Sequence, residues 1–193
     1  MKTMRALLRA RRSALAAAAF CLWAVAASAQ VAKPITVILV RHAEKAAEPA
    51  SDPPLTAEGE ARARDLWQAV KDAGISAVIT TQFARTRGTA QPTAAALGLS
   101  PEIVSAGGAD HPKDVAAAVR RHEGQTVLVV GHSNTIPAII EALGAPKPAA
   151  ICDPEYDNLY VVGLAPGAKA TLIRTKFGAR TPVGAECARM TPH

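Results

Sequence analysis

The sequence predicts an α/β fold: a three-layer α/β/α sandwich with a mostly parallel central sheet and an antiparallel hairpin at one edge. Continuous apolar runs at residues 35–40, 75–80 and 125–130 are typical of strands that are buried on both faces. Each run ends in a polar turn that leads toward a helical segment. This alternation of strands and helices is the pattern that places helices on both faces of a parallel sheet.

The first half of the chain carries clear helix signals. Thr56 is a suitable N-cap for a helix whose apolar residues recur at helical spacing as far as Ala73, just before Gly74. A proline inside a helix removes a hydrogen bond and crowds the preceding turn. We therefore expect Pro92 in the first turn of a helix that ends at Leu97.

The second half predicts shorter elements. We expect a weak third strand, two further helices and a pair of antiparallel edge strands, at residues 102–104, 113–122, 135–143, 159–164 and 170–174 respectively. The last two segments are joined by a Pro-Gly turn, which favours a hairpin.

Residues 1–29 have the three parts of a secretory signal peptide. Residues 1–12 include five basic and no acidic side chains, residues 14–27 are apolar, and residues 27–29 read Ala-Ser-Ala, a typical cleavage site. The apolar run is shorter than the roughly 20 residues that a spanning helix needs. We expect residues 30–193 to form a single periplasmic or secreted domain, without a membrane span once the leader is removed.

The positive charge of the sequence belongs to this leader. The full chain has 22 basic and 16 acidic residues and a net charge of +6. Without the five basic residues of the leader, 17 basic residues stand against 16 acidic ones, a net charge of +1. A near-neutral domain gives no reason to expect binding to nucleic acid.

Two of the three cysteines, Cys152 and Cys187, lie beyond the leader, and Cys21 lies within it. In an oxidising compartment an even number of cysteines favours a disulfide. The alternative is two separate buried thiols.

Basic side chains follow three of the predicted strands. Arg41 and His42 come after the first, Arg85 after the second, and His132 after the next buried one. Parallel strands bring their carboxyl ends to one edge of the sheet, where such folds bind ligands. Positive side chains gathered in one place are costly unless an anion binds between them. The planar guanidinium group of arginine can donate two hydrogen bonds to phosphate oxygens. The sequence predicts a phosphate pocket.

These motifs resemble those of the histidine phosphatase superfamily, the phosphoglycerate mutase-like group. Residues 41–44, Arg-His-Ala-Glu, resemble its Arg-His-Gly-Glu signature, with Ala43 in place of glycine. Residues 55–59 resemble its Leu-Thr-x-x-Gly segment, and residues 80–90 resemble its arginine-containing segment, although Gln82 and Gly88 depart from it. Gly-His-Ser-Asn at residues 131–134 resembles its second histidine motif.

The resemblance implies a role for each of these residues. His42 would be the nucleophile, with Nδ1–H held by a backbone carbonyl and Nε2 free to attack phosphorus. Arg41, Arg85 and His132 would bind the phosphate oxygens and stabilise the transition state. No metal and no cofactor is implied. Arg87 is expected to be a structural or surface residue.

The proton donor for the leaving oxygen is less well defined by the sequence. Asp110, in the glycine-containing loop at 105–112, is one candidate, although it could instead cap the helix that follows. Glu44 is the alternative. His111, His122 and His193 are expected to be exposed and inert.

The sequence therefore predicts a metal-independent phosphomonoester hydrolase that acts through a phosphohistidine intermediate on a small or carbohydrate-type phosphoester. A mutase of the same superfamily is the nearest alternative, but the short segment between Glu44 and Leu55 leaves little room for a lid. A phosphohistidine protein phosphatase and a non-catalytic phosphate-binding module are further alternatives. The oligomeric state is not predicted.

Overall fold

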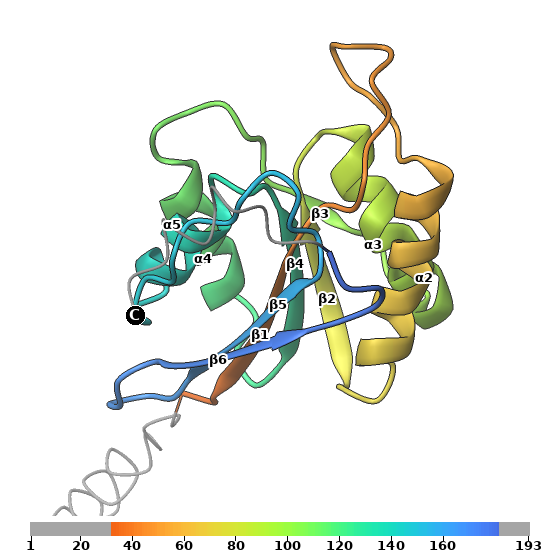
Figure 1. Ribbon diagram of the computed structural model, residues 1–193. Coiled ribbons are helices and arrows are strands. Elements are labelled where there is room, and N and C mark those ends of the chain that lie inside the picture. The colour runs from red at the N-terminus through yellow and green to blue at the C-terminus, as the bar shows by residue number, and fades with distance from the viewer. Residues whose placement is uncertain (1–31, 182–193) are drawn as a thin grey trace, which may run out of the picture. The chain divides into compact units, whose positions relative to one another are not determined.

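The computed structural model describes residues 32–181, in which a six-stranded sheet lies between two pairs of helices (Figure 1). The strands are β1 Ile35–Arg41, β2 Ile75–Thr80, β3 Glu102–Ile103, β4 Thr126–Gly131, β5 Asn158–Leu164 and β6 Thr171–Lys176. The helices are α2 Ala57–Val70, α3 Ala84–Leu97, α4 His111–Arg120 and α5 Ile136–Ala142.

The sheet has the strand order β3-β2-β4-β1-β5-β6. The first four strands are parallel, β5 runs antiparallel to β1, and β6 runs antiparallel to β5. The predicted mostly parallel sheet with an edge hairpin is confirmed. Because β2, β4 and β1 are adjacent and parallel, the residues that follow them lie at one edge of the sheet.

The two faces of the sheet form separate cores. In β1, Val37 and Leu39 belong to the cluster that includes residues of α4 and α5, whereas Ile38 and Val40 belong to the cluster that includes residues of α2 and α3. Successive side chains of a strand point to opposite faces, so an unbroken apolar strand fills both cores. The helices cover both faces (Figure 1), as a three-layer sandwich requires.

Helix α2 begins as predicted. The Oγ1 atom of Thr56, its N-cap, accepts a hydrogen bond of 3.1 Å from the backbone N–H of Gly59. A Cβ atom on Gly59 would lie 2.1 Å from the carbonyl oxygen of Glu44. The glycine of the Leu-Thr-x-x-Gly segment therefore lets α2 pack directly against the backbone that follows His42.

The expectation that Pro92 begins a helix was wrong. Helix α3 is continuous over 14 residues and Pro92 lies inside it, while Arg85 is its second residue. The face of α3 that carries Thr86, Thr89 and Ala90 is buried. Tertiary packing of this face outweighs the loss of one backbone hydrogen bond at the proline, because packing supplies most of the stability of helices in proteins.

Helix α4 begins at His111, two residues before the predicted start. Pro112 stands in its first turn, where its missing N–H costs nothing. This earlier start fixes His111 on the helix rather than in the preceding loop.

The predicted leader, Cys187 and His193 all lie outside the described residues. Between residues 32 and 181, no helix combines the length and the apolar character that crossing a membrane requires. The predicted single domain, its export and its disulfide therefore stay predictions.

We expect the exported protein to contain a Cys152–Cys187 disulfide. Closing a loop of a few tens of residues typically stabilises a fold by about 2–4 kcal/mol. Mass spectrometry of the intact protein without reductant should show the loss of two hydrogens, and alkylation should find no free thiol unless the protein is first reduced. Two alkylated cysteines in unreduced protein would refute the bridge.

Candidate active site

Two histidines meet where β1 and β4 end. Arg41 lies opposite Gly131 in the parallel pairing of these strands, and the backbone N–H of His42 donates to the Gly131 carbonyl at 2.9 Å. The strand register thereby aligns His42 with His132. Their ring centroids are 5.3 Å apart in an edge-to-face arrangement.

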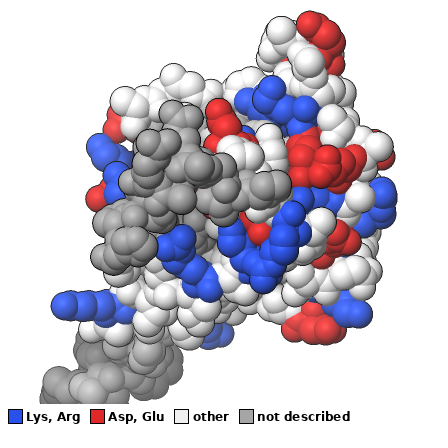
Figure 2. Space-filling model, viewed as in Figure 1, with Lys and Arg blue, Asp and Glu red and all other residues white. Residues whose placement is uncertain are grey.

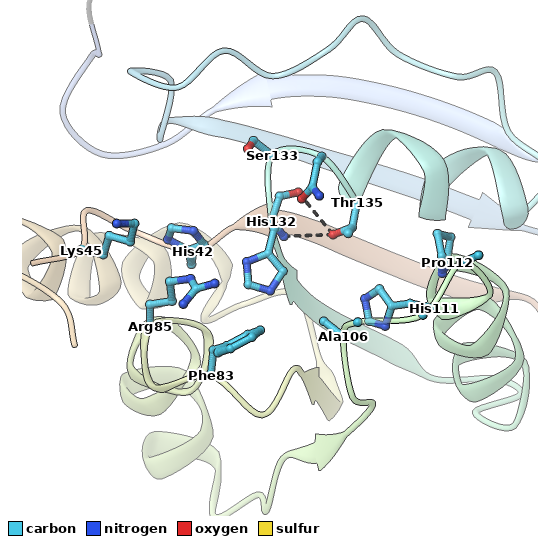
Figure 3. Close-up of a pocket in the computed structure, with 14 residues that line it drawn as sticks. His42, Lys45, Phe83, Arg85, Ala106, His111, Pro112, His132, Ser133 and Thr135 are labelled. Carbon is cyan, nitrogen blue, oxygen red and sulfur yellow. Dashed lines mark hydrogen bonds between the residues drawn. The ribbon is translucent and has the colours of Figure 1, made fainter. Parts of the chain in front are cut away.

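The histidines open into a cavity of about 540 Å³ (Figure 3). Its walls come from the residues after β1, the start of α3, the segment before α4 and the residues after β4. The lining residues are His42, Lys45, Phe83, Arg85, Ala106, Gly107, Gly108, Ala109, His111, Pro112, His132, Ser133, Asn134 and Thr135. Among these described residues there are two basic side chains and three histidines but no carboxylate, so the cavity favours an anionic ligand.

The ring of His42 is held in one orientation. Its Nδ1 atom lies 2.8 Å from the carbonyl oxygen of Ala43, and the ring is buried. The backbone N–H of Ala43 in turn donates to Oγ1 of Thr89 at 2.8 Å. Because a carbonyl oxygen only accepts, Nδ1 carries the proton and Nε2 keeps its lone pair. The predicted contact of Nδ1 with a backbone carbonyl is confirmed.

Both histidines are kept neutral by their surroundings. Burial lowers the pKa of His42 to about 3, and the positive charges nearby act in the same direction, against the hydrogen bond to Ala43. Burial and then the charge of Arg85 lower the pKa of His132 to about 4. An unprotonated imidazole is the form that can act as a nucleophile.

His132 is held from two sides. Its Nε2 atom lies 3.2 Å from Oγ1 of Thr81, the residue that follows β2, and Thr81 is in turn 2.9 Å from Oγ1 of Thr86. On the other side, the backbone N–H of His132 donates to Oγ1 of Thr135 at 3.1 Å. The ends of β2 and β4 are thus joined through this histidine.

Arg85 reaches the cavity from the first turn of α3. Its guanidinium lies 4.2 Å from the ring centroid of Phe83, and the same ring contacts His132 edge-on at 5.6 Å. Asp52 accepts from the backbone N–H of Ala84 at 2.8 Å and so satisfies a free donor at the start of the helix. The Phe83 ring therefore contacts both Arg85 and His132, and all three side chains line the cavity.

Arg41 is placed differently from the prediction. Its Nη1 atom donates to the carbonyl oxygens of Cys152, Asp153 and Glu155 at 2.9, 2.7 and 3.2 Å, and its guanidinium lies 4.2 Å from the Tyr156 ring centroid. It is buried beside the cavity but is not among the residues that line it. Its Nε atom is buried and has no acceptor within residues 32–181.

Glu44 is engaged in a buried ion pair. Arg62 of α2 donates from Nε to both carboxylate oxygens of Glu44 at 2.8 and 2.9 Å, and its Nη2 atom lies 2.7 Å from Oε1. The Arg62 side chain is 2% exposed and that of Glu44 is 12% exposed. The carboxylate predicted as an alternative proton donor thus anchors α2 to the segment after β1.

We expect Glu44→Ala to lower the free energy of unfolding by about 3–5 kcal/mol, because it leaves the Arg62 charge buried without its carboxylate. Urea titration of both proteins would measure this difference. Glu123→Ala removes an exposed carboxylate and should change stability by no more than about 0.5 kcal/mol. A stable Glu44→Ala protein with a specific loss of activity would instead favour a catalytic role.

Asp110 points away from the cavity. Its carboxylate lies 2.9 Å from Nζ of Lys113, the side chain is 72% exposed, and the residue is absent from the cavity lining. It occupies the N-cap position of α4 without a side-chain capping bond. The structure therefore brings together His42, Arg85 and His132, but neither predicted proton donor lies with them.

The expectation that His111 is exposed was wrong. His111 is 3% exposed and lines the cavity. Lys45, Phe83 and Ser133 were also not predicted there. His122 is half-buried and contacts Glu102 at 3.5 Å rather than standing free in solvent. A helical period that started at residue 111 would have predicted the burial of His111, but the adjacent glycines suggested a loop.

The free energy of unfolding should decrease as the pH falls below about 6.5, the pKa of histidine in an unfolded chain. His42 and His132 stay neutral in the native state but take up protons near pH 6.5 when unfolded, so acid favours unfolding. At about pH 5 each should contribute a loss of roughly 2 kcal/mol relative to neutral pH. Urea titrations at several pH values should show a smaller loss in His42→Asn, and an equal loss in both proteins would contradict this origin.

The cationic character of the site is local. On the face shown in Figure 2, basic and acidic side chains are interspersed over the described surface. Within residues 32–181, no three histidine, cysteine, aspartate or glutamate side chains are grouped as metal ligands would be.

The fold and the cavity define an α/β protein with two histidines and an arginine at the carboxyl edge of its sheet. Residues 37–106 match the family model of the histidine phosphatase superfamily (branch 1). The proteins assigned as the phosphoglycerate mutase GpmB are 46% identical over 70 residues in Serratia proteamaculans and 40% identical over 72 residues in Klebsiella pneumoniae. These matches cover 33–34% of this chain and the same share of each relative. These matches support membership of the histidine phosphatase superfamily.

Solved structures extend the likeness over most of the chain. A protein assigned as the phosphohistidine phosphatase SixA in Nakamurella multipartitia is 27% identical, with a TM-score of 0.53 over 78% of this chain and 100% of that one. A protein histidine phosphatase SixA complexed with tungstate has a TM-score of 0.55 at 20% identity, over 73% and 96% of the two chains. The second likeness shows the fold alone.

Proposed function

We propose that this protein is a phosphomonoester hydrolase that acts through a phosphorylated His42. The observation that carries this proposal is the orientation of the His42 ring. Its Nδ1–H is held by the Ala43 carbonyl, so that Nε2 is free at a cavity that Lys45 and Arg85 also line. Membership of the histidine phosphatase superfamily supports phosphoester hydrolysis or transfer.

The proposed reaction has two steps. The Nε2 lone pair of His42 attacks phosphorus while the bond from phosphorus to the leaving oxygen breaks, and water then cleaves the nitrogen–phosphorus bond. Arg85 and His132 would bind the phosphate oxygens and stabilise the charge of the transition state. Arg41 would contribute through its Nε atom, since its Nη1 atom is bound to backbone carbonyls. In this scheme the positive side chains stabilise the negative charge of the transition state, and no metal ion is needed for that purpose.

The substrate is proposed to be a small or carbohydrate-type phosphoester, met in the periplasm or outside the cell after export through the predicted leader. The matched relatives include proteins assigned as mutases, but only about a third of their length is matched. The short segment between Glu44 and Leu55 favours hydrolysis over the retention of an intermediate that a mutase requires.

A phosphohistidine protein phosphatase is the second candidate. The observation in its favour is that no carboxylate lines the cavity within the described residues. An alkoxide leaves poorly without a proton donor, whereas imidazole is a better leaving group and depends less on a carboxylic acid. The Nakamurella protein assigned as SixA also supports this candidate.

A substrate panel distinguishes these functions. The purified protein, with chelator present, should release phosphate from phosphomonoesters, and the panel should include sugar phosphates, 3-phosphoglycerate and a phosphohistidine peptide. Preferred hydrolysis of the peptide would favour the second candidate, and transfer between positions of phosphoglycerate would favour a mutase. Phosphate binding without turnover of any substrate would indicate a non-catalytic module, and activity that chelator abolishes would overturn metal independence.

A further inference from the structure

The proposed hydrolysis needs a proton for the leaving oxygen, and the cavity provides no carboxylic acid for it. Among its described lining residues there is neither an aspartate nor a glutamate. Asp110 pairs with Lys113 in solvent, and Glu44 is bound by Arg62. If an alkyl phosphate is the substrate, the proton has to come from another kind of side chain.

The proposed phosphate-binding and nucleophilic roles leave two titratable side chains of the cavity unused, His111 and Lys45. His111 lies in the first turn of α4, is 3% exposed, and its ring projects toward the cavity on the far side of His132 from His42 (Figure 3). His111 is close enough to His132 that a charge on His111 contributes to lowering the pKa of His132. His111 therefore lines the same cavity as His42 and is not on the outer surface.

The two nitrogens of His111 have different surroundings. Nδ1 lies 3.1 Å from the carbonyl oxygen of Ser105, so Nδ1–H donates to it. Nε2 is buried and has no hydrogen-bond partner within the described part of the chain. Buried polar atoms are almost always paired, so an orphaned nitrogen beside a cavity indicates a bond to a ligand.

The other polar side chains of the cavity are less suited to this role. The Nε2 atom of His132 is already within hydrogen-bond distance of Thr81. Ser133 and Asn134 do not exchange protons readily near neutral pH, and Lys45 lies on the His42 side of the cavity (Figure 3). An imidazole can give and take a proton near neutral pH, which a catalytic acid that later acts as a base must do.

We propose that His111 is the general acid and base of the reaction, a role that rests on the proposed phosphatase function. As His42 attacks phosphorus, the proton on His111 Nε2 passes to the leaving oxygen, so that the substrate departs as a neutral alcohol and His111 becomes neutral. Water then attacks the phosphohistidine and gives a proton to His111 Nε2, while the electron pair of the nitrogen–phosphorus bond returns to His42. Both steps balance without another reactant.

His111→Asn is the sharpest test of this role. The Asn side-chain N–H can replace Nδ1–H in the bond to the Ser105 carbonyl, but an amide cannot act as an acid. For glycerol 2-phosphate, kcat/KM should fall by about 10²–10⁴-fold, the usual contribution of a positioned acid. For p-nitrophenyl phosphate, kcat/KM should change little because the leaving phenolate needs no proton, and a burst of one p-nitrophenol per enzyme should precede a slower steady state.

Asp110→Asn is the matched control, because it changes the neighbouring exposed carboxylate and should leave both substrates unaffected. Equal losses of kcat/KM on the two substrates in His111→Asn, or no loss on either, would overturn the proposed acid. So would a wild-type protein that hydrolyses only the aryl ester, although the hydrolase function would then stand. If the wild type hydrolyses neither ester, the proposed hydrolase function falls, and this inference falls with it.

Discussion

Replacing His42 by alanine should reduce phosphatase activity to background, by about 10⁶-fold if the loss matches that of other enzymes deprived of their nucleophile. The reason is geometric. Nδ1 is fixed by the Ala43 carbonyl, and Nε2 is the free atom at the cavity, so the proposed covalent step has one site. Steady-state assays with p-nitrophenyl phosphate would measure the loss.

The covalent intermediate offers a second measurement. After rapid quenching, wild-type protein should carry phosphate that is stable to base and labile to acid, and His42→Ala should carry none. His122→Ala is the control, because it removes a half-buried imidazole that pairs with Glu102 outside the cavity. Circular dichroism should show that both variants fold. Full activity in a folded His42→Ala protein would contradict the proposed mechanism.

The sequence predicted the central site because strand ends are predictable. His42, Arg85 and His132 each come shortly after an apolar run, and parallel strands carry such residues to one edge. The order of strands along the sheet decides which of them touch. The pairing of β1 with β4, which places the two histidines 5.3 Å apart, is a property of that order and not of any single segment.

The surroundings of the site were harder to predict, because they depend on the helical register. Asp110 and His111 are adjacent, and successive residues of a helix point about 100° apart, so one lies in solvent and the other in the cavity. The prediction for Pro92 failed for a similar reason. The burial of one face of α3 outweighs the preference of proline for the first turn of a helix. Arg41 is held by carbonyls more than one hundred residues away in the sequence, a contact that no local pattern predicts.

The second large effect is expected at Arg85. Its guanidinium is aimed into the cavity by stacking on Phe83, and it is the arginine that lines the cavity among the described residues. Removing one strong transition-state donor typically costs about 10²–10³-fold in kcat. We therefore expect Arg85→Ala to lower kcat/KM for phosphomonoesters by at least this factor, as measured by initial rates under subsaturating substrate.

Two further variants test whether charge or geometry is responsible. Arg87→Ala, two residues along the same helix, removes an exposed arginine that lines a different, largely apolar hollow with Thr80 and Leu99, so activity should change little. Arg85→Lys keeps the charge but loses the planar fork that binds two phosphate oxygens at once, and it should recover only part of the activity. If Arg87→Ala were the damaging change and Arg85→Ala the harmless one, the phosphate would bind on the other side of α3, and the assignment of this cavity as the active site would be wrong.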